Sequence, residues 1–152
     1  MENVKQIPGV VSKVTISYEP AVKVSEMPQV SSAKEIAGLV RPYWDGIDHH
    51  ESFYVLLLNK ANKVIGLNKT FTGGLDMLPV DIKVILQLAI TSNATSIVVM
   101  HNHPSGSLIS SQQDDNITKR IKNACTICEI KLVDHIILTS ESHVSYVDEG
   151  KL

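Results

Sequence analysis

The alternation of apolar and polar positions divides most of the chain into strands and helices. A near-continuous apolar segment, Phe53 to Leu58, is followed by a turn and by Val64 to Leu67, which predicts a hairpin whose first strand is buried on both faces. Apolar residues at helical spacing predict two helices, over residues 80–92 and 112–128. Short apolar runs predict three more strands, over residues 96–100, 133–138 and 143–147.

The first 30 residues follow a different pattern, rich in Val, Pro and Ser, which predicts an irregular arm with a possible edge strand over Val14 to Tyr18. A short helix then begins after Ser32 as its N-cap and ends before Pro42. The order of these elements predicts an α/β fold in which helices pack against one layer of mixed sheet. We therefore expect an N-terminal arm, residues 1–30, and one domain, residues 31–152.

The composition narrows the class of protein. A chain of 152 residues that is 43% hydrophobic and 20% charged is typical of a globular domain that buries a core. A net charge of -2 gives no overall attraction for nucleic acid, although it is compatible with a local basic patch. No apolar run reaches membrane-spanning length and the N-terminus lacks the pattern of a secretory signal, so we expect a cytoplasmic protein without a membrane partner.

The two cysteines, Cys125 and Cys128, have the spacing of a redox pair. Reactive pairs of this kind gain thiolate character at the N-terminus of a helix, whereas these cysteines fall late in the predicted helix over 112–128. Burial of two reduced thiols is therefore the favoured interpretation, and a reducing compartment would keep them reduced.

The candidate chemistry lies in "HNHPSG", residues 101–106, at the end of an apolar run. Neutral imidazole is the commonest nitrogen ligand of zinc, and in extended backbone His101 and His103 share one face. Asp114 falls in the first turn of the next predicted helix, whose start would face back toward this strand end. Two nitrogens and one carboxylate oxygen would leave a tetrahedral zinc ion with an open position for water, as in catalytic sites.

Each of these residues also has an interpretation that needs no metal. Ser111 and Asp114 fit a variant of the capping box at the start of the helix. Glu51 stands at the mouth of a buried strand, where an acid is usually only solvated; hydrolysis by an activated water does, however, require a base that is not a ligand. The remaining histidines are expected to be ordinary core, edge or surface residues: His49, His50, His135 and His143.

Taken together, these polar positions form a pattern that resembles the JAMM signature of MPN/JAB-domain metalloproteases: Glu51, then His101-x-His103-Pro104, then Ser111-x-x-Asp114. The chain is similar to the RadC branch of that family over roughly residues 30 to 150. Two segments carry this similarity: "ITSNATSIVVMHNHPSGSLISSQQDDNITKRI" and "LVDHIILTSESHVSYVDEG". The resemblance implies a three-layer, cytidine-deaminase-like arrangement with a mixed sheet sandwiched by helices.

The resemblance also implies a role for each residue of the motif. Zn²⁺ would be bound by His101, His103 and Asp114. Glu51 would be the general acid/base, and the Ser111 hydroxyl would donate a hydrogen bond to the oxyanion of the tetrahedral intermediate. Family members cleave peptide or isopeptide bonds, so the implied substrate is a peptide or protein that the sequence does not name.

Three functions stay open at this point. A zinc-dependent peptidase or isopeptidase is favoured by the intact set of five motif positions. A non-catalytic RadC-like module could instead act in DNA repair or recombination through nucleic acid or protein contacts. A metal-dependent nuclease is least favoured, since phosphodiester cleavage often uses two metals held by several carboxylates.

Two departures from the RadC pattern bear on these alternatives. RadC proteins usually carry an N-terminal helix-hairpin-helix region, for which we find no counterpart in this sequence, and DNA contact through such a region is not expected. Ser107 stands where an acidic residue is frequent in the branch, a change that concerns the loop more than the ligands. The sequence leaves the oligomeric state open, and an exposed sheet edge would be compatible with an oligomer.

Overall fold

The core of the protein is one mixed sheet. The computed structural model describes Thr15, residues 17–73 and residues 79–152. The five strands lie in the order β2-β1-β3-β4-β5. β1 is antiparallel to β2 and β3, β3 is parallel to β4, and β4 is antiparallel to β5. The strands are β1 (Ser52–Leu58), β2 (Val64–Thr72), β3 (Ser96–Asn102), β4 (Lys131–Leu138) and β5 (His143–Ser145).

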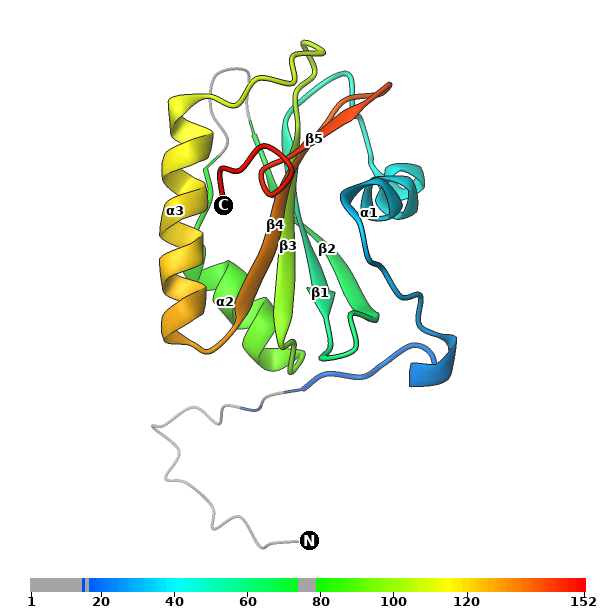
Figure 1. Ribbon diagram of the computed structural model, residues 1–152. Helices are drawn as coiled ribbons and strands as arrows, with labels where there is room; N and C mark the ends of the chain where they lie inside the picture. The colour runs from blue at the N-terminus through cyan, green and yellow to red at the C-terminus, as the bar shows by residue number, and fades with distance from the viewer. Residues whose placement is uncertain (1–14, 16, 74–78) are drawn as a thin grey trace, which may run out of the picture.

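Helices cover both faces of the sheet, which confirms the three-layer arrangement (Figure 1). α1 (Ala33–Val40) packs on one face, and α2 (Ile82–Thr91) and α3 (Gln112–Ile127) pack on the other. Every residue of β1 and β3 is buried, because these central strands have an apolar cluster on each side.

Several elements end elsewhere than the apolar pattern predicts. β2 continues to Thr72, because it pairs with β1 as far as that residue although Phe71 is the only apolar residue after Leu67. β3 continues through Asn102, which pairs with Leu138 of β4, so the first histidine of "HNHPSG" is still in the strand. β5 is shorter than predicted and ends at Ser145. Pro42 does not follow α1 as a simple stop but lies in a 3-10 turn, η2 (Arg41–Tyr43).

The described part of the N-terminal arm runs along the sheet edge at β2. The predicted edge strand over residues 14–18 falls partly outside the described residues, and Thr15, Ser17 and Tyr18 do not form a strand. The Tyr18 hydroxyl instead donates to the Ile65 carbonyl at 3.0 Å. Further along, after a single 3-10 turn, η1 (Val24–Glu26), an isolated antiparallel bridge joins Gln29 to Lys63.

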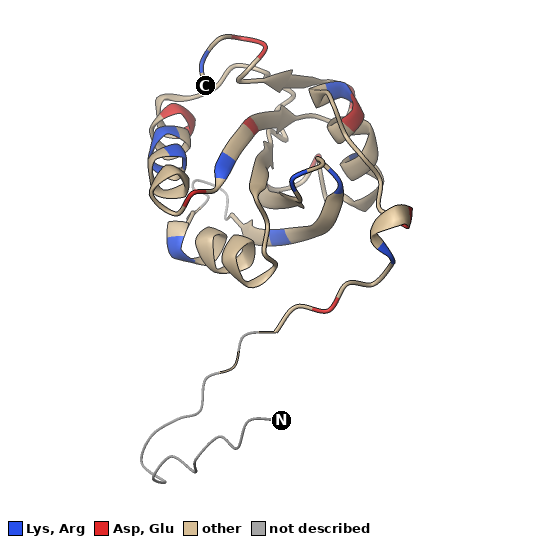
Figure 2. Ribbon diagram, turned by 60° about the horizontal axis from the view of Figure 1, so that its bottom comes forward, with Lys and Arg blue, Asp and Glu red and all other residues tan. Residues whose placement is uncertain are grey.

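The surface carries mixed charge and some apolar area. Figure 2 shows basic and acidic positions interspersed over the fold, with a concentration of basic ones on α3, where Lys119, Arg120 and Lys122 are exposed.

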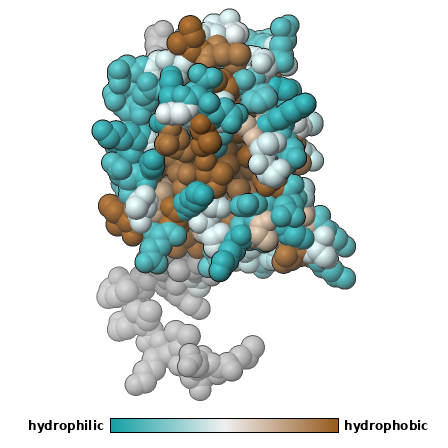
Figure 3. All heavy atoms as spheres, in the orientation of Figure 1, coloured by the Kyte–Doolittle hydropathy of each residue, from teal (hydrophilic) through white to brown (hydrophobic). Residues whose placement is uncertain are grey.

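Figure 3 shows apolar atoms in the middle of the face viewed in Figure 1. There β5 pairs only with Ile136–Leu138, so the first half of β4 forms a sheet edge. None of the helices in the described ranges has both the length and the apolar character to cross a membrane.

Candidate metal centre

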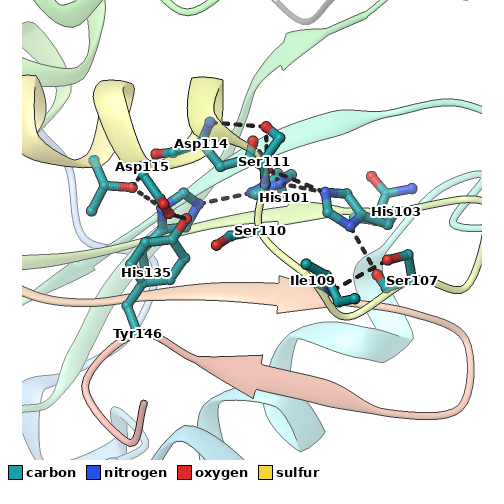
Figure 4. A network of polar contacts seen from close by, with 12 residues as sticks. His101, His103, Ser107, Ile109, Ser110, Ser111, Asp114, Asp115, His135 and Tyr146 are labelled. Carbon is teal, nitrogen blue, oxygen red and sulfur yellow. Dashed lines mark hydrogen bonds and ion pairs between the residues drawn. The ribbon is translucent and has the colours of Figure 1, made fainter. Parts of the chain in front are cut away.

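The candidate centre lies where β3 ends and α3 begins. β3 and β4 are parallel and α3 connects them, and ligands of α/β proteins commonly bind outside the carboxyl ends of such strands. His101 is at the end of β3, His103 follows the strand, and the chain turns back through Gly106, whose φ of 80° suits glycine. α3 then starts with Asp114 in its first turn, so three residues from two elements converge (Figure 4).

The spacing of these three side chains suits a tetrahedral metal ion. His101 Nε2 lies 3.0 Å from His103 Nε2 and 3.2 Å from Asp114 Oδ1, and His103 Nε2 lies 3.6 Å from Asp114 Oδ2. Ligand atoms bound tetrahedrally to zinc at their usual bond lengths are about 3.3 Å from one another. Within the described ranges, one group of histidine, cysteine and acidic side chains has the proximity that a metal ion needs, and it is this one.

The hydrogen bonds around the group leave acceptor lone pairs facing its centre. His103 Nδ1 donates to the Ser107 carbonyl at 2.8 Å, because a carbonyl can only accept, and the neutral ring then has its lone pair on Nε2. Asp114 Oδ2 accepts from the Ser111 backbone N–H and from the Ser111 hydroxyl, both at 2.7 Å, while Oδ1 turns toward His101. Such a cluster of acceptors is suited to a cation.

In the absence of a metal ion, the two histidines stabilise the negative charge of Asp114. Burial alone would raise the pKa of Asp114, but its hydrogen bonds with His101 and His103 outweigh burial and hold that pKa far below the ordinary range. The same interaction with Asp114 raises the pKa of His103, with burial opposing it and the Glu51 carboxylate adding to the rise. Asp114 is therefore an anion at neutral pH, as a metal ligand must be.

The capping interpretation of Ser111 and Asp114 is confirmed and coexists with the metal interpretation. Ser111 is the N-cap of α3, its hydroxyl oxygen accepts from the Asp114 N–H at 3.1 Å, and the Asp114 carboxylate accepts in return. The reciprocal bonds hold the carboxylate in one orientation, toward the two histidines. The cap therefore preorganises the proposed ligand.

Glu51 reaches the same place from β1. Phe53 of β1 pairs with His101 of β3 in an antiparallel register, so Glu51, two residues earlier, lies beside His103, two residues later. Glu51 and the three metal-cluster side chains line one cavity of ≈ 480 Å³, together with Ser111. All five residues that the motif singled out are thus brought together.

Comparison with known proteins agrees with this architecture. A family model described as "RadC-like JAB domain" matches residues 30–151. The chain belongs to this family. It is 38% identical over 130 residues to a UPF0758 protein of Flavobacterium johnsoniae, and the match covers 86% of the chain and 56% of that relative. It is also 38% identical over 122 residues to a UPF0758 protein of Clostridium beijerinckii, covering 80% of the chain and 53% of the relative.

The relatives are longer than this chain. It spans about half the length of the curated relatives it matches, including a UPF0758 protein of Haemophilus ducreyi that is 39% identical over 102 residues, 67% of the chain and 46% of the relative. Their shared name states no activity. The function of this RadC-like JAB domain therefore has to be argued from its site.

Asn102 is a site residue that the sequence analysis passed over, although it stands between the two histidines. It is fully buried, and its side chain faces away from the metal cluster, toward the loop that precedes β1. Its amide donates to the carbonyls of Ile47 at 2.7 Å and His50 at 2.9 Å, and its Oδ1 accepts from the Ser52 N–H at 2.7 Å. These bonds tie the segment that carries Glu51 to the strand that carries His101.

His135 was expected to be an ordinary strand histidine, and its burial is confirmed: its ring is fully buried in β4. The ring nevertheless belongs to the centre, because His135 Nε2 lies 2.8 Å from Nδ1 of His101 (Figure 4). Burial lowers the pKa of His135 well below its ordinary value, so the ring is neutral at neutral pH. The other histidines stay outside the centre: His49, His50 and His143.

The cysteines do not form a redox pair. Cys125 is buried on the inner face of α3, Cys128 is partly buried, and both are free thiols. Burial raises the pKa of the Cys125 thiol to about 11, which keeps it protonated and unreactive. The expected burial is confirmed for Cys125 and holds only in part for Cys128.

Proposed function

We propose that this RadC-like JAB domain is a zinc-dependent hydrolase of the JAMM type that cleaves a peptide or isopeptide bond. The observation that carries the proposal is the convergence of two imidazole nitrogens and one carboxylate, at tetrahedral ligand spacing, in the cavity that also contains Glu51. A purely structural cluster would have no need of an acidic side chain at that place.

The proposed ligands are His101, His103 and Asp114, whose donor atoms suit zinc in number and kind. When bound, zinc would acidify a water molecule and polarise the scissile carbonyl. The three residues themselves hold their orientation through the Ser107 carbonyl, the Ser111 cap and the buried His135 ring.

Glu51 is the proposed base. From its place beside His103, the carboxylate can accept a proton from the attacking water and pass it to the leaving amine. A residue in this role must not be a ligand, and Glu51 is outside the group of three that can hold the ion.

Ser111 is the proposed donor to the carbonyl oxygen as negative charge develops on it. In the structure its hydroxyl donates to Asp114 Oδ2, so rotation about one side-chain bond would redirect it into the cavity. Asp114 would keep the backbone N–H of Ser111 as a partner during that rotation, and the ligand orientation would be preserved.

The cavity walls suit a peptide segment. Apolar side chains from three elements or loops form part of the lining, and polar side chains of α3 form another part. Apolar walls exclude water and polar ones give direction to a bound chain, as in most ligand sites. The apolar residues are Phe53, Pro79, Val80 and Ile117, and the polar ones on α3 are Gln113, Asn116 and Arg120.

The proposal is tested with a library of linear peptides and branched isopeptides incubated with the zinc-loaded protein in H₂¹⁸O. Hydrolysis is read by mass spectrometry as one ¹⁸O atom in each new carboxylate. Wild type and the surface control Glu141→Gln should cleave equally, whereas Glu51→Gln should bind zinc normally and lose cleavage. Cleavage by Glu51→Gln at the wild-type rate would show that Glu51 is not the base.

A second candidate, the non-catalytic module that binds nucleic acid, is supported by the exposed Lys119, Arg120 and Lys122 on α3. If these three side chains neutralise phosphates, the slope of log affinity against log salt for duplex DNA should change by roughly 3 when all are replaced by Gln. Fluorescence anisotropy with labelled DNA measures that slope. Absence of binding at about 50 mM salt would reject this candidate.

A further inference from the structure

We propose that His135, held by Thr118, is a positioning residue that fixes His101 in the tautomer whose Nε2 is free to bind the metal. The proposal rests on the metal site of the proposed function and extends it from the ligands to the groups behind them. It follows from counting hydrogens along three side chains that contact one another: Thr118, His135 and His101.

The count begins at Thr118 on α3. Its Oγ1 lies 2.6 Å from the carbonyl oxygen of Asp114, one turn earlier, and also contacts Nδ1 of His135. Two oxygens at that separation repel each other unless a hydrogen lies between them, and the carbonyl has none to offer. The single hydroxyl hydrogen therefore points to Asp114, and Thr118 must accept the hydrogen of His135 Nδ1.

The count continues through the buried ring of His135. A neutral imidazole has one N–H, and here it is on Nδ1, so Nε2 carries a lone pair. Nε2 lies 2.8 Å from His101 Nδ1, and this contact needs exactly one hydrogen, which His101 Nδ1 must then supply. With its hydrogen on Nδ1, His101 has a bare Nε2, so the one hydrogen that its 3.0 Å contact with His103 Nε2 needs lies on His103, and a metal ion at the centre would replace that hydrogen.

Packing prevents the His135 ring from leaving this position. The ring is fully buried and stacks on the Tyr146 ring at 4.7 Å between centroids and 15° between planes. Phe53 lies against it from the side of β1, with 6.1 Å between centroids. Tyr146 is itself anchored, because its hydroxyl donates to Asp115 Oδ1 at 2.8 Å (Figure 4). The ring therefore cannot turn to find another partner.

Each of the two proposed imidazole ligands is thus oriented by a partner on its Nδ1 nitrogen, and the two partners differ in kind. A backbone carbonyl, that of Ser107, accepts from His103 Nδ1, whereas a side-chain relay accepts from His101 Nδ1. Partners of this kind raise the basicity of a ligand and restrict its orientation, and their loss typically weakens metal binding by about 10 to 100-fold.

The test uses Thr118→Val, which keeps the shape of the side chain and removes the hydroxyl. Without that acceptor, Nδ1 of His135 faces a methyl group, so the His135 hydrogen should move to Nε2 and force His101 into the opposite tautomer. Thr118→Ser restores the hydroxyl. Thr126→Val is the matched control, because Thr126 on the same helix makes the same bond to the carbonyl four residues earlier, that of Lys122, but is exposed.

Two readouts are measured at pH 8. Long-range ¹H–¹⁵N correlation on the metal-free protein reports which nitrogen of each histidine is protonated, and competition with a chromophoric chelator reports the affinity for Zn²⁺. Wild type, Thr118→Ser and Thr126→Val should show His101 protonated on Nδ1. Thr118→Val should show it protonated on Nε2, with an affinity for Zn²⁺ lower by about 10 to 100-fold.

The tautomer separates positioning from a merely structural role, since loss of stability alone would leave it unchanged. The proposal is overturned if His101 of the wild type is protonated on Nε2, or if Thr118→Val keeps both the wild-type tautomer and the wild-type affinity. A wild type that shows the expected tautomer but binds no Zn²⁺ would contradict the proposed function while supporting the hydrogen-bond relay.

Discussion

Phe53 in β1 lies directly opposite His101 in β3. Side chains two residues apart on a strand share a face, so this register directs Glu51 to the same side of the sheet as the two histidines. A shift of one residue would turn Glu51 toward the α1 side instead. The relation between Glu51, the proposed base, and the proposed metal ligands is therefore a property of the β1–β3 ladder, which joins residues about fifty positions apart in the chain.

The first prediction concerns Asn102, which ties the Glu51 segment to β3. Asn102→Ala removes three hydrogen bonds and leaves the buried Ser52 N–H without its partner. We expect the free energy of unfolding to fall by about 2–4 kcal/mol, with zinc affinity nearly unchanged, because the ligands themselves are not touched. Urea denaturation and zinc competition measure the two effects.

The control for this prediction is Asn123→Ala, which changes the same residue type on the exposed face of α3 and should alter stability by less than about 0.5 kcal/mol. Equal stability of the Asn102 and Asn123 variants would mean that the bonds of Asn102 do not hold the segment before β1.

The second prediction concerns Gly46, at the start of that same segment. Its φ of 64° disfavours other residues, and an added Cβ would lie 2.5 Å from Cε1 of His50. Gly106 has a φ of 80° but open space around its missing Cβ. Gly106→Ala should therefore lower the free energy of unfolding by about 1–2 kcal/mol, because it adds only backbone strain. Gly46→Ala should lower it further, because it adds the contact with His50 as well.

A double variant separates strain from collision in this pair. Gly46→Ala combined with His50→Ala removes the ring that the new methyl group meets. The loss of unfolding free energy that Gly46→Ala causes in the His50→Ala background should therefore equal the loss that Gly106→Ala causes in wild type. Thermal unfolding of the four variants measures this. If Gly46→Ala were no more destabilising than Gly106→Ala, the His50 ring would not be held where the structure has it.

The third prediction concerns the thiols. Because burial raises the pKa of Cys125 to about 11, only about one molecule in a thousand carries the thiolate at pH 8. Cys128→Ser, which retains Cys125, should react with a thiol reagent much more slowly when folded than when unfolded, and the rate of the folded variant should rise about tenfold per pH unit toward pH 11. Rapid reaction of the native variant at pH 8 would contradict the burial of Cys125.

The same raised pKa has a consequence for stability. Above its ordinary value of 9.0 the unfolded chain loses the Cys125 proton while the folded chain retains it, so the unfolded state binds fewer protons. The contribution of the protonated thiol is complete below pH 9.0 and is lost as the pH rises through about 11. Cys125→Ala should flatten the decline of stability in this window relative to wild type.

The pattern of apolar and polar residues predicted most of the fold. The continuous apolar run before Leu58 predicted a strand buried on both faces, and burial on both faces is what β1 has, because adjacent strands and packed helices leave it no solvent side. Strand ends were less predictable. β2 continues past Leu67 through polar residues, since its pairing with β1 depends on backbone bonds that any side chain permits.

The candidate site was predictable as a set of residues but not as a network. The motif named Glu51 and the ligands, and chain spacing placed Asp114 in the first turn of α3. Asn102 and His135 gave no such signal, because their roles depend on partners 50 to 55 residues and 34 residues away, respectively, in the sequence. Contacts of that kind are set by strand order, which the pattern of apolar residues does not contain.

The central claim is that three side chains form a metal site, and the most direct measurement is metal content per chain by elemental analysis. Wild type, Asp114→Ala and the exposed control Asp148→Ala are each loaded with zinc, desalted and checked for folding by circular dichroism. The account predicts about one zinc in wild type and in Asp148→Ala, and almost none in folded Asp114→Ala. A folded wild type that retains no zinc, or an Asp114→Ala variant that retains as much as wild type, would contradict it.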